Sequence, residues 1–151
     1  MVQSLADELI RVVDEAATEL RAIDEMLATS KRRPDVWSVK EIVGHLIDSA
    51  ANNHQRFVRA QQVAELSLQG YDQDAWVRSQ DHQSRLWPEL LEFWVLYNHH
   101  LSHTIRCIPE SALSVRCRIG TNEAVTLRFL VEDYMVHLRH HLKQIKERRA
   151  A

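Results

Sequence analysis

The chain has 151 residues, of which 45% are hydrophobic and 26% charged, and it contains only 3 glycines and 3 prolines. This composition is typical of a folded domain that buries enough apolar surface to need neither a disulfide nor a structural metal. The 19 basic and 21 acidic residues give a formal net charge of −2. We therefore predict a single domain over residues 1–151. We expect no binding to nucleic acid or anionic membranes, because both require an excess of positive charge.

The first ten residues include Asp7 and Glu8 and lack the apolar stretch of a signal peptide. No apolar run reaches the ~20 residues that a membrane-spanning helix requires. Cys107 and Cys117 match no redox or zinc-ribbon spacing. A cytoplasmic protein with reduced thiols is the expectation.

The first half of the chain is expected to contain two long helices. Apolar residues recur every three or four positions over residues 3–28, which predicts an amphipathic helix. Ser38 and Glu41 have the spacing of a capping box, and a second helix should follow over residues 39–62. Residues 64–82 show no steady period and predict a loop that includes no more than a short turn.

The second half of the chain is expected to contain two more long helices. The apolar pattern predicts a helix over residues 85–107, with Pro88 in its first turn, where a missing N–H does no harm. Residues 113–126 alternate between apolar and polar and predict a short hairpin or an extended connection. A last helix over residues 126–148 ends in basic residues that suit its dipole. The expected fold is all-α, a four-helix bundle with a long crossover between the second and third helices.

Nine histidines are unusual for a chain of this length. His137 and His141 are four positions apart, so on a helix their Cβ atoms lie about 5–6 Å apart on one face, and two imidazoles can share an ion. Chance also produces such pairs, as at His99 and His103. However, His137 and His141 lie within the apolar stripe of their helix, whereas His140 points roughly 100° away. Buried imidazoles without partners are costly, and a shared metal removes that cost.

The second predicted helix offers a third ligand. His45 lies between apolar positions, and the adjacent Gly44 would let another helix or a ligand approach the backbone closely. Three neutral imidazoles from two helices form an open metal site whose remaining positions are left to water or substrate. The predicted metal ligands are His45, His137 and His141.

Polar residues follow His45 along the same side of this helix. Ser49, Asn52 and Arg56 lie within about 40° of it on a helical wheel. Asp48 is a candidate for an outer-shell partner of the metal or a base. We therefore predict Asp48, Asn52 and Arg56 as catalytic or pocket residues, with a solvated polar face as the alternative for Arg56.

Two further groups have a structural and a functional interpretation. His99, His100 and His103 on the third helix are expected to form an ordinary polar face, with a second site or a pocket lining as the alternative. The aromatic and acidic residues 71–76 either tether the crossover by burying Trp76 or form the rim of a pocket. The sequence contains no HExxH, ExxH or phosphate-loop motif.

Four segments together resemble the DinB/YfiT-like superfamily of four-helix-bundle metalloenzymes, and most closely its YfiT-like branch. They are residues 37–49, 52–56, 71–76 and 134–145, in this order and separation. The resemblance implies one metal-binding histidine from the second helix and a pair from the last, which correspond to His45, His137 and His141. It also implies a divalent ion, commonly zinc or nickel, and frequently a homodimer.

Characterised members of the superfamily include thiol-dependent S-transferases. The leading functional hypothesis is therefore a metal-dependent transferase, in which a low-molecular-weight thiol bound as thiolate attacks a small electrophilic substrate. A hydrolase that activates water is the first alternative. The second alternative is a non-catalytic stress protein that binds a metal or another ligand. The third is a purely structural helical bundle.

Overall fold

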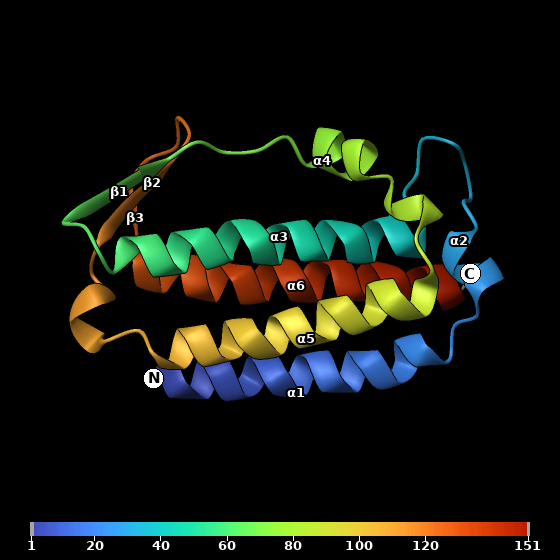
Figure 1. Ribbon diagram of the computed structural model, residues 1–151, viewed down its shortest axis with the longest axis horizontal. Coiled ribbons are helices and arrows are strands. Elements are labelled where there is room, and N and C mark those ends of the chain that lie inside the picture. Colours follow the sequence, from blue (N-terminus) through green and yellow to red (C-terminus); the bar gives the residue numbers. More distant parts are fainter. Residues whose placement is uncertain (1, 151) are drawn as a thin grey trace.

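The computed structural model describes the backbone of residues 2–150 and the side chains of residues 2–149. Four long helices run lengthwise in two layers (Figure 1). They are α1 (Val2–Arg21), α3 (Val39–Ala60), α5 (Trp87–Arg106) and α6 (Leu127–Ala150). This is the predicted four-helix bundle, with a small sheet added at one end (Figure 1). No helix in the described part of the chain combines the length and the apolar character needed to cross a membrane.

The apolar stripes of the helices meet in one core. Helix α5 packs against both α1 and α3, and α3 also packs against α6. Trp94 and Phe57 are fully buried at the centre. Because α3 and α6 are antiparallel neighbours (Figure 1), residues far apart in the sequence lie side by side along their contact.

The helix predicted over residues 3–28 is interrupted, so this prediction was wrong in its length. Helix α1 ends at Arg21, and a short helix, α2 (Glu25–Thr29), follows. The Asp24 side chain accepts a hydrogen bond from the Leu27 N–H at 2.7 Å and starts the new helix. An aspartate that caps a following turn ends the preceding helix even where the apolar period continues.

The capping box before α3 is present as predicted. The Ser38 hydroxyl accepts a hydrogen bond from the Glu41 N–H at 3.1 Å, and the Glu41 carboxylate accepts one from the Ser38 N–H at 2.8 Å. Both bonds satisfy backbone donors at the helix start. The residue at which α3 starts is fixed by this local interaction.

The crossover between α3 and α5 is more ordered than predicted. It contains β1 (Glu65–Leu68), α4 (Gln73–Gln80) and the 3-10 turn η1 (His82–Ser84). Helix α4 has one buried residue, Val77, so it leaves no apolar period in the sequence. Trp76 is 37% exposed, so it does not tether the crossover by burial as one interpretation had it.

The predicted hairpin is present. After the 3-10 turn η2 (Glu110–Ala112), strand β2 (Arg116–Ile119) pairs with β3 (Val125–Thr126) in antiparallel fashion. Strand β1 adds in parallel, with Leu66 opposite Cys117. Sequence reasoning missed β1 because its partner strand lies about 50 residues away, beyond the reach of any local pattern.

Candidate metal centre

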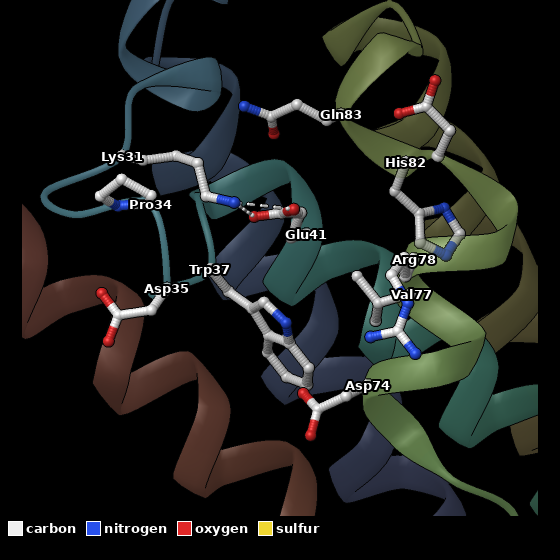
Figure 2. Close-up of a pocket in the computed structure, with 11 residues that line it drawn as sticks. Lys31, Pro34, Asp35, Trp37, Glu41, Asp74, Val77, Arg78, His82 and Gln83 are labelled. Carbon is white, nitrogen blue, oxygen red and sulfur yellow. Dashed lines mark hydrogen bonds and ion pairs between the residues drawn. The ribbon is translucent and has the colours of Figure 1, made fainter.

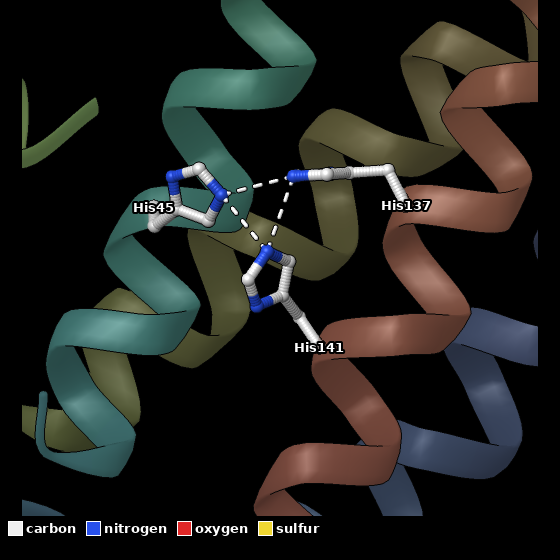
Figure 3. Close-up of side chains that lie close together, drawn as sticks. All are labelled: His45, His137 and His141. Atoms are coloured by element: carbon white, nitrogen blue, oxygen red, sulfur yellow. Dashed lines mark hydrogen bonds between the residues drawn. The ribbon is translucent and has the colours of Figure 1, made fainter. Parts of the chain in front are cut away.

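Three imidazoles converge between α3 and α6 (Figure 3). His45 projects from α3, and His137 and His141 project from successive turns of α6. The His45 Nε2 atom lies 3.0 Å from that of His137 and 3.1 Å from that of His141, and the last two are 3.1 Å apart. The structure therefore brings the three predicted ligands together at one point.

These three contacts cannot all be hydrogen bonds. A ring nitrogen of a neutral imidazole is either a donor or an acceptor. In a triangle of such atoms at least one pair must consist of two donors or two acceptors, and that pair repels. A cation among the three nitrogens turns three lone pairs into ligands and removes the repulsion.

The outer ring nitrogens determine which proton each imidazole carries. The His141 Nδ1–H donates to the Gln144 side-chain oxygen at 2.8 Å, which leaves the lone pair on Nε2. The Ser49 hydroxyl lies 3.4 Å from Nδ1 of His137. The Nδ1 atom of His45 is buried with no partner among the described residues. His141 is therefore oriented with its Nε2 lone pair toward the centre of the triad, as a metal ligand requires.

Burial also keeps the three imidazoles neutral. It lowers the pKa of His45 to about 3, together with the neighbouring His141, His137 and His82. Burial and His141 likewise lower the pKa of His137 to about 4. The pKa of His141 is also lowered by burial, with a partial offset from Gln144. All three lone pairs are therefore available at neutral pH.

An open cleft borders the triad on the side of the crossover. Its volume is about 550 Å³, and its lining includes Trp37, Gln73, Asp74, His137 and His141. The Trp37 ring covers His45, with ring centroids 5.0 Å apart. The triad is thus shielded by an aromatic ring and open to a small molecule on the cleft side.

His140 lies outside the cluster of ligand atoms, which agrees with its predicted direction. It is exposed at the edge of the same cleft, with Nε2 3.3 Å from the Gln144 amide nitrogen. It therefore belongs to the rim rather than to the triad.

Asp48 does not contact the triad. It is 2% exposed, and its partners among the described residues lie on the crossover: Gln80 donates to it at 2.8 Å, and His82 Nε2 lies 3.4 Å away. The carboxylate anchors the crossover onto α3. Its predicted role as a base or outer-shell partner therefore has no support in the geometry.

Gly44 explains how His82 reaches Asp48. A Cβ atom at Gly44 would lie less than 3.0 Å from three carbon atoms of the His82 side chain. His82 is 3% exposed and also lines a neighbouring pocket of about 390 Å³ together with Trp37 (Figure 2). The close approach predicted at Gly44 thus comes from the crossover. Sequence reasoning missed His82, which is a single histidine in a segment without periodicity.

The other two polar residues predicted to follow His45 along α3, Asn52 and Arg56, differ in their surroundings. Asn52 donates to the Asp48 backbone carbonyl at 2.9 Å, a bond within its own helix. Arg56 lies farther along α3 and lines a separate cavity with Tyr71. The structure does not bring Asn52 or Arg56 into contact with the histidine triad.

The histidines of α5 follow the structural interpretation. His99 pairs with Asp14 at 2.7 Å, and the exposed His103 lies 3.8 Å from the free thiol of Cys107. His100 packs against the ring of His54. Within residues 2–149, the triad is the one group of three or more potential metal ligands, so these side chains form a polar face.

Replacing Gln144 with alanine should weaken zinc binding about 10–100-fold, because His141 loses the acceptor that orients its ring. Gln144→Glu is the matched control, because a carboxylate keeps the acceptor. Titration of metal-free protein with zinc against a chromophoric chelator measures both. Equal affinities for Gln144→Ala and the unmodified chain would show that packing alone orients the ring.

The metal-free protein should lose stability as the pH falls from about 7 to 5. The folded pKa values of about 3 and 4 for His45 and His137 lie below the ordinary value of 6.5. The unfolded chain therefore takes up protons first, and the free energy of unfolding decreases below pH 6.5 by up to about 1.4 kcal/mol per pH unit for each histidine. Urea denaturation at pH 7.5, 6 and 5 measures the change. His45→Asn should flatten the dependence, and an unchanged midpoint in the unmodified chain would contradict the neutral triad.

Comparison with known proteins agrees with this architecture. Residues 8–145 match the sequence profile of the DinB superfamily. The chain is 24% identical over 146 residues to the Bacillus subtilis protein YfiT, an alignment that covers 93% of this chain and 82% of YfiT. The solved structure of YfiT, described as a probable metal-dependent hydrolase with an unusual four-helix bundle topology, superposes with a TM-score of 0.81 at 23% identity. That superposition covers 96% of this chain and 87% of the YfiT chain. The chain belongs to the DinB superfamily.

Proposed function

We propose that this protein is a metal-dependent enzyme that binds a divalent ion, zinc or nickel, through His45, His137 and His141. We further propose that it transfers a low-molecular-weight thiol to a small electrophile. The observation that carries the proposal is the meeting of three neutral imidazole nitrogens within 3.1 Å of one another. Without a cation, at least one pair of these nitrogens repels. With a cation, the three nitrogens together form a complete set of protein ligands.

The donor set fits such an ion. Imidazole nitrogens bind zinc at about 2.0–2.1 Å. His45, His137 and His141, with nitrogens 3.0–3.1 Å apart, would hold one such ion together, and the cleft that borders them would admit a small molecule.

When bound, the ion would supply positive charge that lowers the pKa of a coordinated thiol or water molecule toward neutral values. The chain itself supplies the rest: Gln144 and Ser49 hold the imidazoles in the required orientation, and Trp37 shields His45 from solvent. In S-transfer the thiol loses its proton to solvent, its sulfur forms a bond to the electrophilic carbon, and the leaving group departs. This chemistry needs no carboxylate base, which suits a site whose nearby Asp48 is paired with the crossover.

Hydrolysis is the second candidate, and the description of the relative YfiT favours it. Zinc-loaded protein should be assayed with 1-chloro-2,4-dinitrobenzene with and without cysteine, and with p-nitrophenyl acetate. Consumption of the aryl chloride that requires both zinc and cysteine supports S-transfer. Ester turnover that requires zinc alone supports hydrolysis instead.

Two controls separate the remaining outcomes. His137→Ala should lose both zinc and activity, whereas His140→Ala should keep both. Stoichiometric zinc binding without turnover of any substrate would indicate a ligand-binding protein. Failure to bind either zinc or nickel would overturn the proposal entirely.

A further inference from the structure

Arg56 is a half-buried cation without an ion-pair partner. No carboxylate oxygen of residues 2–149 lies within 4.0 Å of its guanidinium nitrogens, and the guanidinium donates to the Asn53 side-chain oxygen at 3.5 Å. By contrast, several more exposed arginines are paired with carboxylates: Arg11, Arg21, Arg33, Arg106 and Arg139. Burial lowers the pKa of Arg56, and Tyr71 and Asp133 offset only part of this effect. The guanidinium has therefore lost part of its water without forming a direct ion pair.

This guanidinium lines a cavity of about 320 Å³ between the crossover, the sheet and α6. Tyr71 also lines it, together with four apolar residues, Ile119, Val125, Phe129 and Leu130, and with the polar Asn122, Glu123 and Asp133. The cavity therefore offers both a cation and apolar surface to a small molecule. A volume of this size is in the range of small-molecule sites.

The cavity lies close to the histidine triad. Tyr71 lies near enough to Ser49 for that side chain to lower the pKa of its hydroxyl, and the Ser49 hydroxyl lies 3.4 Å from Nδ1 of His137. Asp133, in the cavity wall, precedes His137 by four residues of α6, about 6 Å along the axis. The part of the cavity formed by Asp133 is therefore about one helical turn from the triad.

We propose that Arg56 and Tyr71 bind the carboxylate of a small monocarboxylic acid whose apolar part packs against Ile119, Val125, Phe129 and Leu130. The planar guanidinium matches a carboxylate with two parallel hydrogen bonds. Glu123 and Asp133 line the same cavity and repel negative charge, so a single carboxylate held at the guanidinium is favoured over dianions such as phosphate esters, which they repel more strongly. We further infer that this acid is the substrate of the metal site, and this step rests on the proposed function.

Benzoate and benzamide test this directly, because they share a shape and differ in charge. Each is titrated into the unmodified ¹⁵N-labelled protein, metal-free and zinc-loaded, and the resonances of the Gly70 amide and the Arg56 Nε–H are followed. We expect benzoate to bind at least tenfold more tightly than benzamide and to shift both resonances. Equal binding of the two, or shifts only at residues outside the cavity, would overturn the proposal.

Two variants of Arg56 test whether its guanidinium binds the carboxylate. Arg56→Gln should abolish the preference for benzoate, and Arg56→Lys should retain part of it. Arg59→Gln, which alters an exposed arginine on the same helix, should change nothing. Zinc affinity measured on the same samples keeps the two proposals apart: benzoate binding without zinc binding refutes the metal site alone, and zinc binding without a benzoate preference refutes the carboxylate site alone.

Discussion

Replacing His137 or His141 with alanine is expected to weaken zinc binding by at least about 100-fold, and replacing His45 should do the same. Each variant removes one of three nitrogens that meet within 3.1 Å. Loss of an outer-shell partner alone typically costs 10–100-fold in affinity, so loss of a ligand should cost more. Elemental analysis of purified protein and zinc titration of the metal-free form measure the effect.

His140→Ala is the matched control, because this side chain is a neighbour in sequence that lies outside the triad. It should retain stoichiometric zinc. Stability provides a second measurement: zinc at about 100 times its dissociation constant should raise the free energy of unfolding of the unmodified chain by about 2.7 kcal/mol and leave the triad variants unchanged. Equal losses of zinc from all four variants would contradict the assignment of helix faces.

Gly44→Ala should destabilise the fold by about 3 kcal/mol. The new methyl group would overlap three carbon atoms of the buried His82 side chain. Overpacking of a filled core costs about 1–3 kcal/mol, and displacement of His82 also removes a partner from the buried Asp48 carboxylate. The higher helix propensity of alanine recovers about 1 kcal/mol of this. Urea denaturation measures the net change.

Gly70→Ala is the control for this substitution, because nothing lies within 4 Å of a Cβ atom at that position. It should alter stability by no more than about 0.5 kcal/mol. His82→Gly should remove the overlap, including the contact with the Cβ atom that alanine would keep, so the double variant Gly44→Ala/His82→Gly should be no less stable than His82→Gly alone. Additive losses in the double variant would show that Gly44→Ala acts through some contact other than His82.

The centre of the triad could be anticipated because it depends on short-range regularities. Residues four apart share a helix face, so the i,i+4 spacing of His137 and His141 places them together, and the capping box at Ser38 marks the start of the helix that carries His45. Both regularities act within one or two turns of helix. The chain therefore specifies these faces before any helix packs against another.

Features that depend on distant partners could not be anticipated. The partners of Asp48, Gln80 and His82, could not be predicted because they come from a crossover whose path no local pattern reveals. The cavity beside Arg56 likewise forms only where the sheet, the crossover and α6 meet. The break after Arg21 was missed for another reason, since the apolar stripe continues across it while Asp24 caps a new turn.

The amino-acid order by itself determined the number of long helices, the apolar face of each, and the presence of imidazoles on two of those faces, because helical periodicity and capping are local properties of the chain. Packing of α3 against α6 decided that the imidazoles meet at one point, and the course of the crossover decided which side of that point stays open and which carboxylate is removed from it. These outcomes depend on side chains 30 to 100 positions apart competing for the same space and the same hydrogen-bond partners, and that competition is settled only in the folded molecule.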